Sequence, residues 1–220
     1  MNKKSSRHRG KSSTSRPTKP EHHKPQHQQG NAGHKTGSIR IIAGAHRGRK
    51  LPVHDVAGLR PTTDRVKETV FNWLMQQVQG SHCLDCFAGS GSLAFEALSR
   101  GAKSVTLVEK DPLAASQIEQ NLALLAIDNA QLIKGDCLGF LGTLTLDQAG
   151  GFDLVFIDPP FRQNLANPVC QLLEERKLLN PSALIYVEVE NELNDFTPPP
   201  QWQLLKEKVA GQVSFRLYQR

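Results

Sequence analysis

The chain has 220 residues, of which 38% are hydrophobic and 22% are charged, and its formal net charge is +6. This length fits one compact domain with an appendage. No apolar run reaches the roughly 18 residues needed to cross a bilayer, and the N-terminus lacks the apolar segment of a secretory signal. These features argue against a membrane or secreted protein, and we expect a cytoplasmic one without a membrane partner.

The N-terminal part of the chain differs in composition from the rest. Residues 1–40 carry ten Lys or Arg and one acidic residue, for a net charge of +9, whereas residues 41–220 have a net charge of −3. Residues 1–37 contain no Val, Ile, Leu, Phe, Tyr or Trp. Such a stretch buries too little apolar surface to offset the entropy of ordering it, so we predict a disordered basic tail. The tail suits the phosphates of a nucleic acid, or it only keeps the protein soluble.

The four cysteines do not form the pattern of a disulfide framework or a metal site. Cys83 and Cys86 make one C-x-x-C pair, but no second pair completes a zinc site, and Cys137 and Cys170 stand alone. Cys83 and Cys86 also lie in an apolar segment. We therefore expect buried free thiols in a reducing compartment, and no metal.

The first ordered elements are two short strands and a helix. The strands, at about 39–42 and 50–53, flank a glycine-rich basic segment and predict a β-hairpin. Thr62 or Thr63 can cap the helix that follows. Apolar residues at helical spacing extend this helix to about Gly80.

Strands and helices alternate from residue 81 onward. We expect strands at 83–87, 104–109, 130–134, 152–157 and 183–189, helices at 92–99, 112–126, 138–146 and 164–179, and a closing antiparallel pair at 202–208 and 213–218. This order predicts an α/β, Rossmann-like fold with a mostly parallel seven-stranded sheet that is covered on both faces. The chain then divides into a basic tail (1–37), a hairpin-and-helix extension (38–80) and the α/β domain (81–220).

A glycine-rich turn, Asp85-Cys-Phe-Ala-Gly-Ser-Gly91, joins the first strand of this domain to a helix. Gly89 and Gly91 let the backbone approach a ligand closely. Glu109 ends the next strand, where a carboxylate can accept hydrogen bonds from both ribose hydroxyls, and Asp136 after the third strand can bond an adenine amino group. This arrangement predicts an adenosine-type cofactor and leaves NAD and S-adenosylmethionine both open.

The apolar strand at 152–157 ends in Asp158, Pro159, Pro160 and Phe161. The two prolines make a stiff turn with free carbonyl groups. An aromatic amine is a poor nucleophile, and the side chain of Asp158 and the carbonyl of Pro159 can accept its N–H groups as it attacks. Phe161 can stack on an extruded base. An NAD dehydrogenase has no use for such a turn, so the turn favours methyl transfer to a base.

The order of these motifs resembles the class I S-adenosylmethionine-dependent methyltransferases that modify amino groups. The upstream segments Arg40-Ile-Ile-Ala-Gly44, Arg47-Gly-Arg-Lys-Leu51, Arg60-Pro-Thr-Thr-Asp-Arg65 and Phe71-Asn-Trp-Leu74 are more specific. They resemble the RsmD family, which are 16S ribosomal RNA (guanine-N2)-methyltransferases. The resemblance covers about residues 38–220 and does not include the tail.

The resemblance implies S-adenosylmethionine as the cofactor. It assigns the cofactor to Asp85, Phe87, Gly89, Gly91, Glu109 and Asp136, and catalysis to Asp158, Pro159, Pro160 and Phe161. The clustered basic residues of the extension are our candidates for RNA phosphates: Arg40, Arg47, Arg49, Lys50, Arg60 and Arg65. Arg60 or Arg65 could instead meet the methionine carboxylate.

We therefore predict a monomeric enzyme that methylates guanine N2 in 16S ribosomal RNA or in the small ribosomal subunit. Three alternatives remain open at this point. They are an adenine-N6 or cytosine-N4 nucleic-acid methyltransferase, an NAD-dependent oxidoreductase, and a non-catalytic RNA-binding protein that keeps the fold.

Overall fold

The computed structural model of the protein describes residues 1–2, 37–54, 63–146, 150–191 and 196–220. The predicted disorder of the basic tail and the predicted role of Arg60 lie outside these residues. The described residues from Gly37 onward form one compact unit, which contains both the described part of the extension and that of the α/β domain. No helix of the described part is long and apolar enough to span a bilayer.

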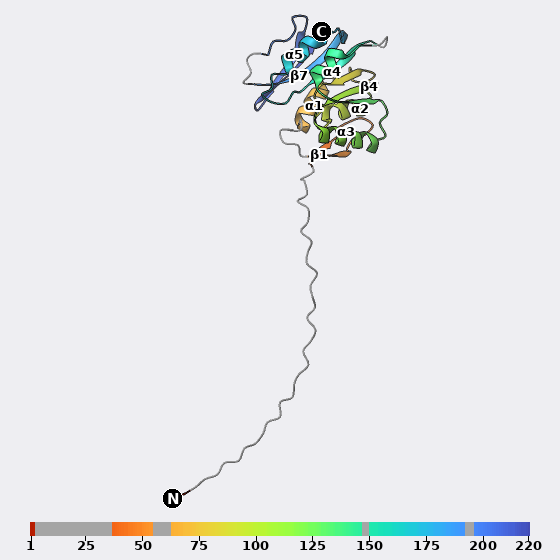
Figure 1. The fold of residues 1–220 in the computed structure, drawn as a ribbon. Coiled ribbons are helices and arrows are strands. Elements are labelled where there is room, and N and C mark those ends of the chain that lie inside the picture. Colours follow the sequence, from red (N-terminus) through yellow and green to blue (C-terminus); the bar gives the residue numbers. More distant parts are fainter. Residues whose placement is uncertain (3–36, 55–62, 147–149, 192–195) are drawn as a thin grey trace. The chain divides into compact units, whose positions relative to one another are not determined.

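A seven-stranded sheet runs through this unit in the order β5-β4-β3-β6-β7-β9-β8. Figure 1 labels two of its strands, β4 and β7, and the helices around them. The strands are β3 (His82–Asp85), β4 (Ser104–Glu109), β5 (Ala130–Lys134), β6 (Phe152–Ile157), β7 (Leu179–Glu190), β8 (Gln203–Ala210) and β9 (Val213–Gln219). The first five of the sheet order are parallel, and β9 and β8 close it antiparallel. The predicted Rossmann-like architecture is confirmed. Since the chain runs outward from β3 to β5 and then returns to β6, the strand order reverses between β3 and β6.

Within the described residues, five helices cover the sheet: α1 (Asp64–Trp73), α2 (Ser92–Ser99), α3 (Pro112–Leu124), α4 (Cys137–Thr143) and α5 (Ala166–Glu175). The buried apolar residues form two clusters. One joins α1, α2 and α3 to side chains such as Phe156, and the other joins α4 and α5 to side chains such as Val155. Because Phe156 and Val155 are adjacent in one strand, the two clusters lie on opposite faces of the sheet.

The hairpin β1 (Gly37–Arg40) and β2 (Lys50–Val53) forms a separate two-stranded sheet. Ile39 pairs with Leu51, and both side chains are buried in the same cluster as α1, α2 and α3. The amide of Asn121 on α3 donates to the carbonyl of Pro52 at 3.0 Å. The hairpin therefore contributes apolar side chains to the core of the domain.

Several predicted boundaries are wrong although the elements exist. The first helix is capped by Thr63 as expected, but it ends at Trp73 and not near Gly80, because the chain continues in turns that still bury Val78. Helix α5 ends before Lys177, whose φ of +56° is left-handed, and β7 then begins at Leu179.

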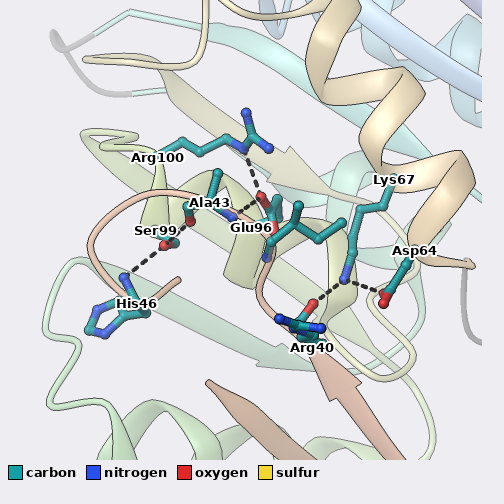
Figure 2. Close-up of polar contacts among 9 residues, drawn as sticks. Arg40, Ala43, His46, Asp64, Lys67, Glu96, Ser99 and Arg100 are labelled. Carbon is teal, nitrogen blue, oxygen red and sulfur yellow. Dashed lines mark hydrogen bonds and ion pairs between the residues drawn. The ribbon is translucent and has the colours of Figure 1, made fainter. Parts of the chain in front are cut away.

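The loop between the hairpin strands is held against α2 by a buried carboxylate (Figure 2). The side chain of Glu96 is fully buried and accepts hydrogen bonds from the backbone of Ile42 at 2.8 Å and of Ala43 at 3.0 Å. The guanidinium of Arg100 donates to the same carboxylate at 2.7 Å. The charge of Glu96 is thereby paired, and its oxygens satisfy backbone groups of a segment more than fifty residues away.

A second set of contacts fixes both ends of this loop. The Ser99 hydroxyl donates to the Ala43 carbonyl and accepts from the His46 backbone, and a Cβ at Gly44 would lie 1.8 Å from the Ser99 carbonyl oxygen. On the side of α1, the ammonium of the buried Lys67 donates to the Arg40 carbonyl at 2.5 Å (Figure 2). Helices α1 and α2 therefore clamp the basic loop.

We predict that Glu96→Gln destabilises the protein by on the order of 1–3 kcal/mol, because it removes the charge opposite Arg100 and turns one acceptor of backbone N–H groups into a donor. Denaturant unfolding measures the change. The exposed Glu68 on α1 offers a matched control, and Glu68→Gln should stay within about 0.5 kcal/mol of the wild type. Equal stability of the two variants would contradict the role of Glu96 in holding the hairpin loop against α2.

Candidate active site

The predicted site residues come together where the parallel strands end. Asp85 ends β3, Glu109 ends β4 and Asp158 directly follows β6. Strand β3 pairs with β4 on one side and with β6 on the other. The three carboxylates therefore stand on neighbouring strands at one edge of the sheet. Ligands of open α/β sheets bind at this edge, at the point where the strand order reverses.

The glycine turn is tied to the end of β4. The N–H of Gly89 donates to one oxygen of Glu109 at 2.6 Å, and the N–H of Asp111 donates to the other at 2.7 Å. Gly91 has a φ of +75°, and a Cβ there would lie 2.6 Å from the ring of Phe95. Burial raises the pKa of Glu109. Glu109 therefore shapes the turn, and a carboxylate with two such bonds retains acceptor capacity for hydroxyl groups.

Two buried polar atoms at this turn have no hydrogen-bond partner within the described part of the chain: Oδ1 of Asp85 and Oγ of Ser92. Asp85 is 2% exposed, and burial raises its pKa to about 7, against the effect of the N–H groups of Phe87 and Ala94. Buried polar groups in native proteins nearly always have a hydrogen-bond partner. These two oxygen atoms therefore indicate a bound ligand with hydrogen-bond donors.

The charge of these groups distinguishes between the two cofactors that the sequence left open. Asp85 places a buried carboxyl group at the glycine turn, whereas a carboxylate at the position of Glu109 fits the ribose of either cofactor. The pyrophosphate of NAD would bring further negative charge to Asp85, whereas S-adenosylmethionine carries an ammonium and a sulfonium group. The residues present therefore fit S-adenosylmethionine. Asp85 can hold its ammonium group, and Glu109 its ribose hydroxyls.

Asp136 and Phe87 have structural contacts that the sequence did not indicate. Asp136 is the N-cap of α4 and accepts from the Gly139 N–H at 2.9 Å through one oxygen. Its assignment to the adenine amino group stays a prediction that would use the other oxygen. Phe87 is half-buried and packs against the cluster below α4 and α5.

A pocket lies beside the turn that follows β6. The turn contributes Asp158, Pro159, Pro160, Phe161 and Arg162, α5 and its approach contribute Asn164, Leu165 and Ala166, and β7 and β9 contribute Glu188, Val189, Glu190 and Val213. The side chain of Phe161 is 45% exposed. It is therefore not a core residue, and its ring is accessible for stacking on a base.

Sequence reasoning missed the acidic residues of β7 that face this pocket. Tyr186 is buried and its hydroxyl donates to Glu188 at 2.6 Å. Glu190 accepts from the backbone N–H of Arg162, a residue with a φ of +61°, at 2.5 Å and so holds the turn. The sequence contained a signal for them. Glu109 was selected because it is a carboxylate at the carboxyl end of a parallel strand, and Glu188 and Glu190 lie at such an end too.

The described basic candidates lie on the hairpin and on α1. Arg40, Arg47, Arg49 and Lys50 are exposed on the hairpin, and Arg65 is exposed in the first turn of α1. None of these five lines the pocket beside Asp158. The clamp around Glu96 and Lys67 fixes the backbone that carries them, which gives a rigid basic surface next to the domain core.

We predict that Asp85→Asn stabilises the cofactor-free protein. The folded pKa of about 7 lies above the ordinary 3.8, so the carboxylate costs stability above pH 7, and this cost disappears as the pH falls toward 3.8. The melting temperature should therefore rise by a few degrees above pH 7, at about 2–4 °C per kcal/mol, and by less near pH 5. Calorimetry should show S-adenosylmethionine binding weakened by about tenfold to a hundredfold. An unchanged affinity would remove Asp85 from the cofactor site.

Comparison with known proteins supports the relationship that the motifs suggested. The family described as "Conserved hypothetical protein 95" matches residues 39–219. Ribosomal RNA small subunit methyltransferase D of Escherichia coli K12 is 51% identical over 185 residues, which cover 84% of this chain and 91% of that protein. The protein of the same name from Haemophilus influenzae is 54% identical over 83% of this chain and 94% of its own length.

A solved structure agrees with the fold as well. The structure of yhhF from Escherichia coli superposes with a TM-score of 0.75 at 50% identity, and the match covers 84% of this chain and 98% of that one. A sequence identity of this size supports more than a shared fold. The residues that the family matches include both the glycine turn and the Asp158 turn. This protein belongs to the RsmD family.

Proposed function

We propose that this protein transfers the methyl group of S-adenosylmethionine to the exocyclic N2 of a guanine in 16S ribosomal RNA. Its family makes it an S-adenosylmethionine-dependent methyltransferase that acts on ribosomal RNA. The observation that carries the proposal is the Asp158–Phe161 turn, which lines a pocket one strand away from the glycine turn. A base in that pocket would have its amino group near the cofactor.

The reaction is an in-line displacement at a methyl carbon, and S-adenosylmethionine supplies that methyl group when it is bound. The lone pair of guanine N2 is delocalised into the ring, so the amine needs hydrogen-bond acceptors as positive charge develops on it. Asp158 and the carbonyl of Pro159 supply these acceptors at the turn. Phe161 holds the base by stacking. Asp158 then takes the proton that the amine releases, directly or through a water molecule.

The alternatives differ in what the pocket must hold. The buried carboxyl group of Asp85 disfavours NAD, and the pocket beside Asp158 argues against a protein that only binds RNA. An adenine-N6 or cytosine-N4 methyltransferase would use the same turn. Its product separates it from the enzyme proposed here. The expected monomeric state and cytoplasmic location stay predictions.

The proposal is tested with labelled S-adenosylmethionine and either naked 16S ribosomal RNA or unmodified small subunits. Mass spectrometry of the digested product should find N2-methylguanine in one of the two substrates. N6-methyladenine or N4-methylcytosine in its place would support the alternatives. The two substrate arms also establish whether the enzyme acts on RNA alone or on the assembled subunit.

We predict that Asp158→Ala lowers the methylation rate by about 10²–10³-fold while cofactor affinity stays within about twofold. The reason is that Asp158 lines the pocket for the amine, whereas the glycine turn is bonded to Glu109. Single-turnover methyl transfer measures the rate, and calorimetry measures cofactor binding. A variant that keeps near wild-type turnover would place the acceptor role on another group.

We predict that replacing both Arg47 and Arg49 by Ala weakens RNA binding and flattens its salt dependence. For each phosphate that the variant no longer neutralises, the slope of log affinity against log salt should fall by roughly 0.7–0.9. The exposed Lys206 and Lys208 on β8 provide a control that removes the same charge elsewhere. If both double variants show equal slopes, the hairpin loop is not a specific RNA surface.

A further inference from the structure

Glu188 stands next to Asp158 at the edge of the sheet. Strands β6 and β7 are parallel, and their paired register ends with Ile157 opposite Val187. Asp158 and Glu188 directly follow this last pair, so they lie next to each other where β6 ends, and Glu188 itself stays in β7 opposite Phe215 of β9. Both line the same pocket. The pocket for the target base thus has a second carboxylate beside the one that we assign to the amine.

Glu188 is held by a rigid partner. The hydroxyl of the buried Tyr186 donates to one of its oxygens at 2.6 Å. The ring of Tyr186 packs against Phe156 and Phe215, with ring centroids 6.3 Å and 6.4 Å away. Tyr186 therefore fixes the direction of the carboxylate, and the second oxygen of Glu188 retains acceptor capacity.

The electrostatic environment keeps Tyr186 protonated, as a hydrogen-bond donor to Glu188 must be. Burial and the charges of Glu188 and Asp158 raise the pKa of Tyr186, so its hydroxyl keeps the proton that it donates. Burial raises the pKa of Glu188, and the bond from Tyr186 opposes that effect. The contribution of Asp158 to the pKa of Tyr186 also places the Asp158 charge close to this pair.

Glu190 differs from Glu188 although it lies two residues further along the same strand. It accepts from the backbone N–H of Arg162 and so supports the turn that carries Phe161. Its bond is to the protein backbone, whereas that of Glu188 is to a side chain that directs it. Variants of the two carboxylates can therefore be compared. Glu190 supports the turn, whereas Glu188 is directed toward the base by Tyr186.

The bases differ in what they present beside the reactive amine. Guanine has a second donor, N1–H, directly next to N2. Adenine has the lone pair of N1 next to its amine, and cytosine has that of N3. A flipped base is recognised by hydrogen bonds to this edge. Two adjacent acceptors match guanine, whereas the second would face a ring lone pair in the other two bases and repel it.

We propose that Glu188 is the residue that selects guanine, by accepting N1–H while Asp158 and the carbonyl of Pro159 accept the amine. This inference rests on the proposed function, methylation of guanine N2, and assigns the base specificity of that reaction to a named side chain. Tyr186 acts through Glu188 as a positioning residue.

The test compares two target bases that differ only at N1 and at O6. Small subunits are reconstituted with 16S ribosomal RNA that carries guanine or 2-aminopurine at the methylated nucleotide. 2-Aminopurine keeps the exocyclic amine but has a lone pair at N1. The measured quantity is the ratio of the methylation rates of the two substrates. The change in this ratio between variant and wild type carries the test, because the intrinsic reactivity of each amine cancels.

Glu188→Gln should lower the preference for guanine by about tenfold to a hundredfold, because the amide nitrogen donates to N1 of 2-aminopurine and opposes N1–H of guanine. Tyr186→Phe should shift the ratio in the same direction by less, since it frees the carboxylate without removing it. Glu190→Gln is the matched control. It should slow both substrates alike and leave the ratio unchanged.

The outcomes separate this inference from the function on which it rests. If the wild type forms N2-methylguanine and Glu188→Gln keeps the wild-type ratio, the role of Glu188 is wrong and the proposed function stands. If the wild type forms no N2-methylguanine in any substrate, both are wrong. Melting temperatures and cofactor affinities confirm that each variant is folded. Should Glu188→Gln fail to fold, the ratio measured with Tyr186→Phe decides, and an unshifted ratio there overturns the inference.

Discussion

The pairing of β3 with both β4 and β6 is the constraint on which the rest of the site depends. Because the three strands are parallel, their carboxyl ends meet at one edge, and the groups that follow them are brought together from distant parts of the chain. The glycine turn follows β3, Glu109 ends β4, and Asp158 follows β6. The pairing of β6 with β7 adds Glu188 to the same edge.

The two buried carboxyl groups of Glu96 and Asp85 have different roles in this protein. Glu96 is fully buried, but its charge is paired with Arg100 and its oxygens satisfy backbone N–H groups, so it holds the hairpin loop in place. Asp85 is equally buried and has an oxygen without a partner in the described structure. A buried carboxylate of that kind costs stability and is retained where a ligand completes its bonds. The contrast separates a structural carboxylate from a binding one.

Much of the fold could be predicted from the sequence because its signals are local. The bounds of β4, β5 and β6 were predicted to the residue from the sequence, and so were those of α2, which begins directly after Gly91. The glycine turn and the Asp158 turn carried the site for the same reason, since each is a short continuous motif. The ends of α1 and α5 were predicted less well, because turns and one left-handed residue, Lys177, decide them.

The rest of the site depends on contacts between distant residues. Glu96 is 54 residues from Ile42, and nothing near it in the sequence indicates that it anchors a loop. The place of Glu188 beside Asp158 follows from the β6–β7 register, which the sequence does not contain. The cap that Asp136 provides for α4 is local, but a Gly-Asp pair fits a turn, a cap and a ligand equally well.

The central claim is that one sheet edge holds the cofactor and the target base in adjoining places. A crystal structure of the protein with S-adenosylhomocysteine and guanosine tests it most directly. The account predicts the amino acid part of the cofactor at Asp85, the guanine stacked on Phe161, its N2 beside Asp158 and its N1 within hydrogen-bond distance of Glu188. Guanosine bound away from the pocket between the Asp158 turn and β7, or a cofactor bound away from the glycine turn, would contradict it.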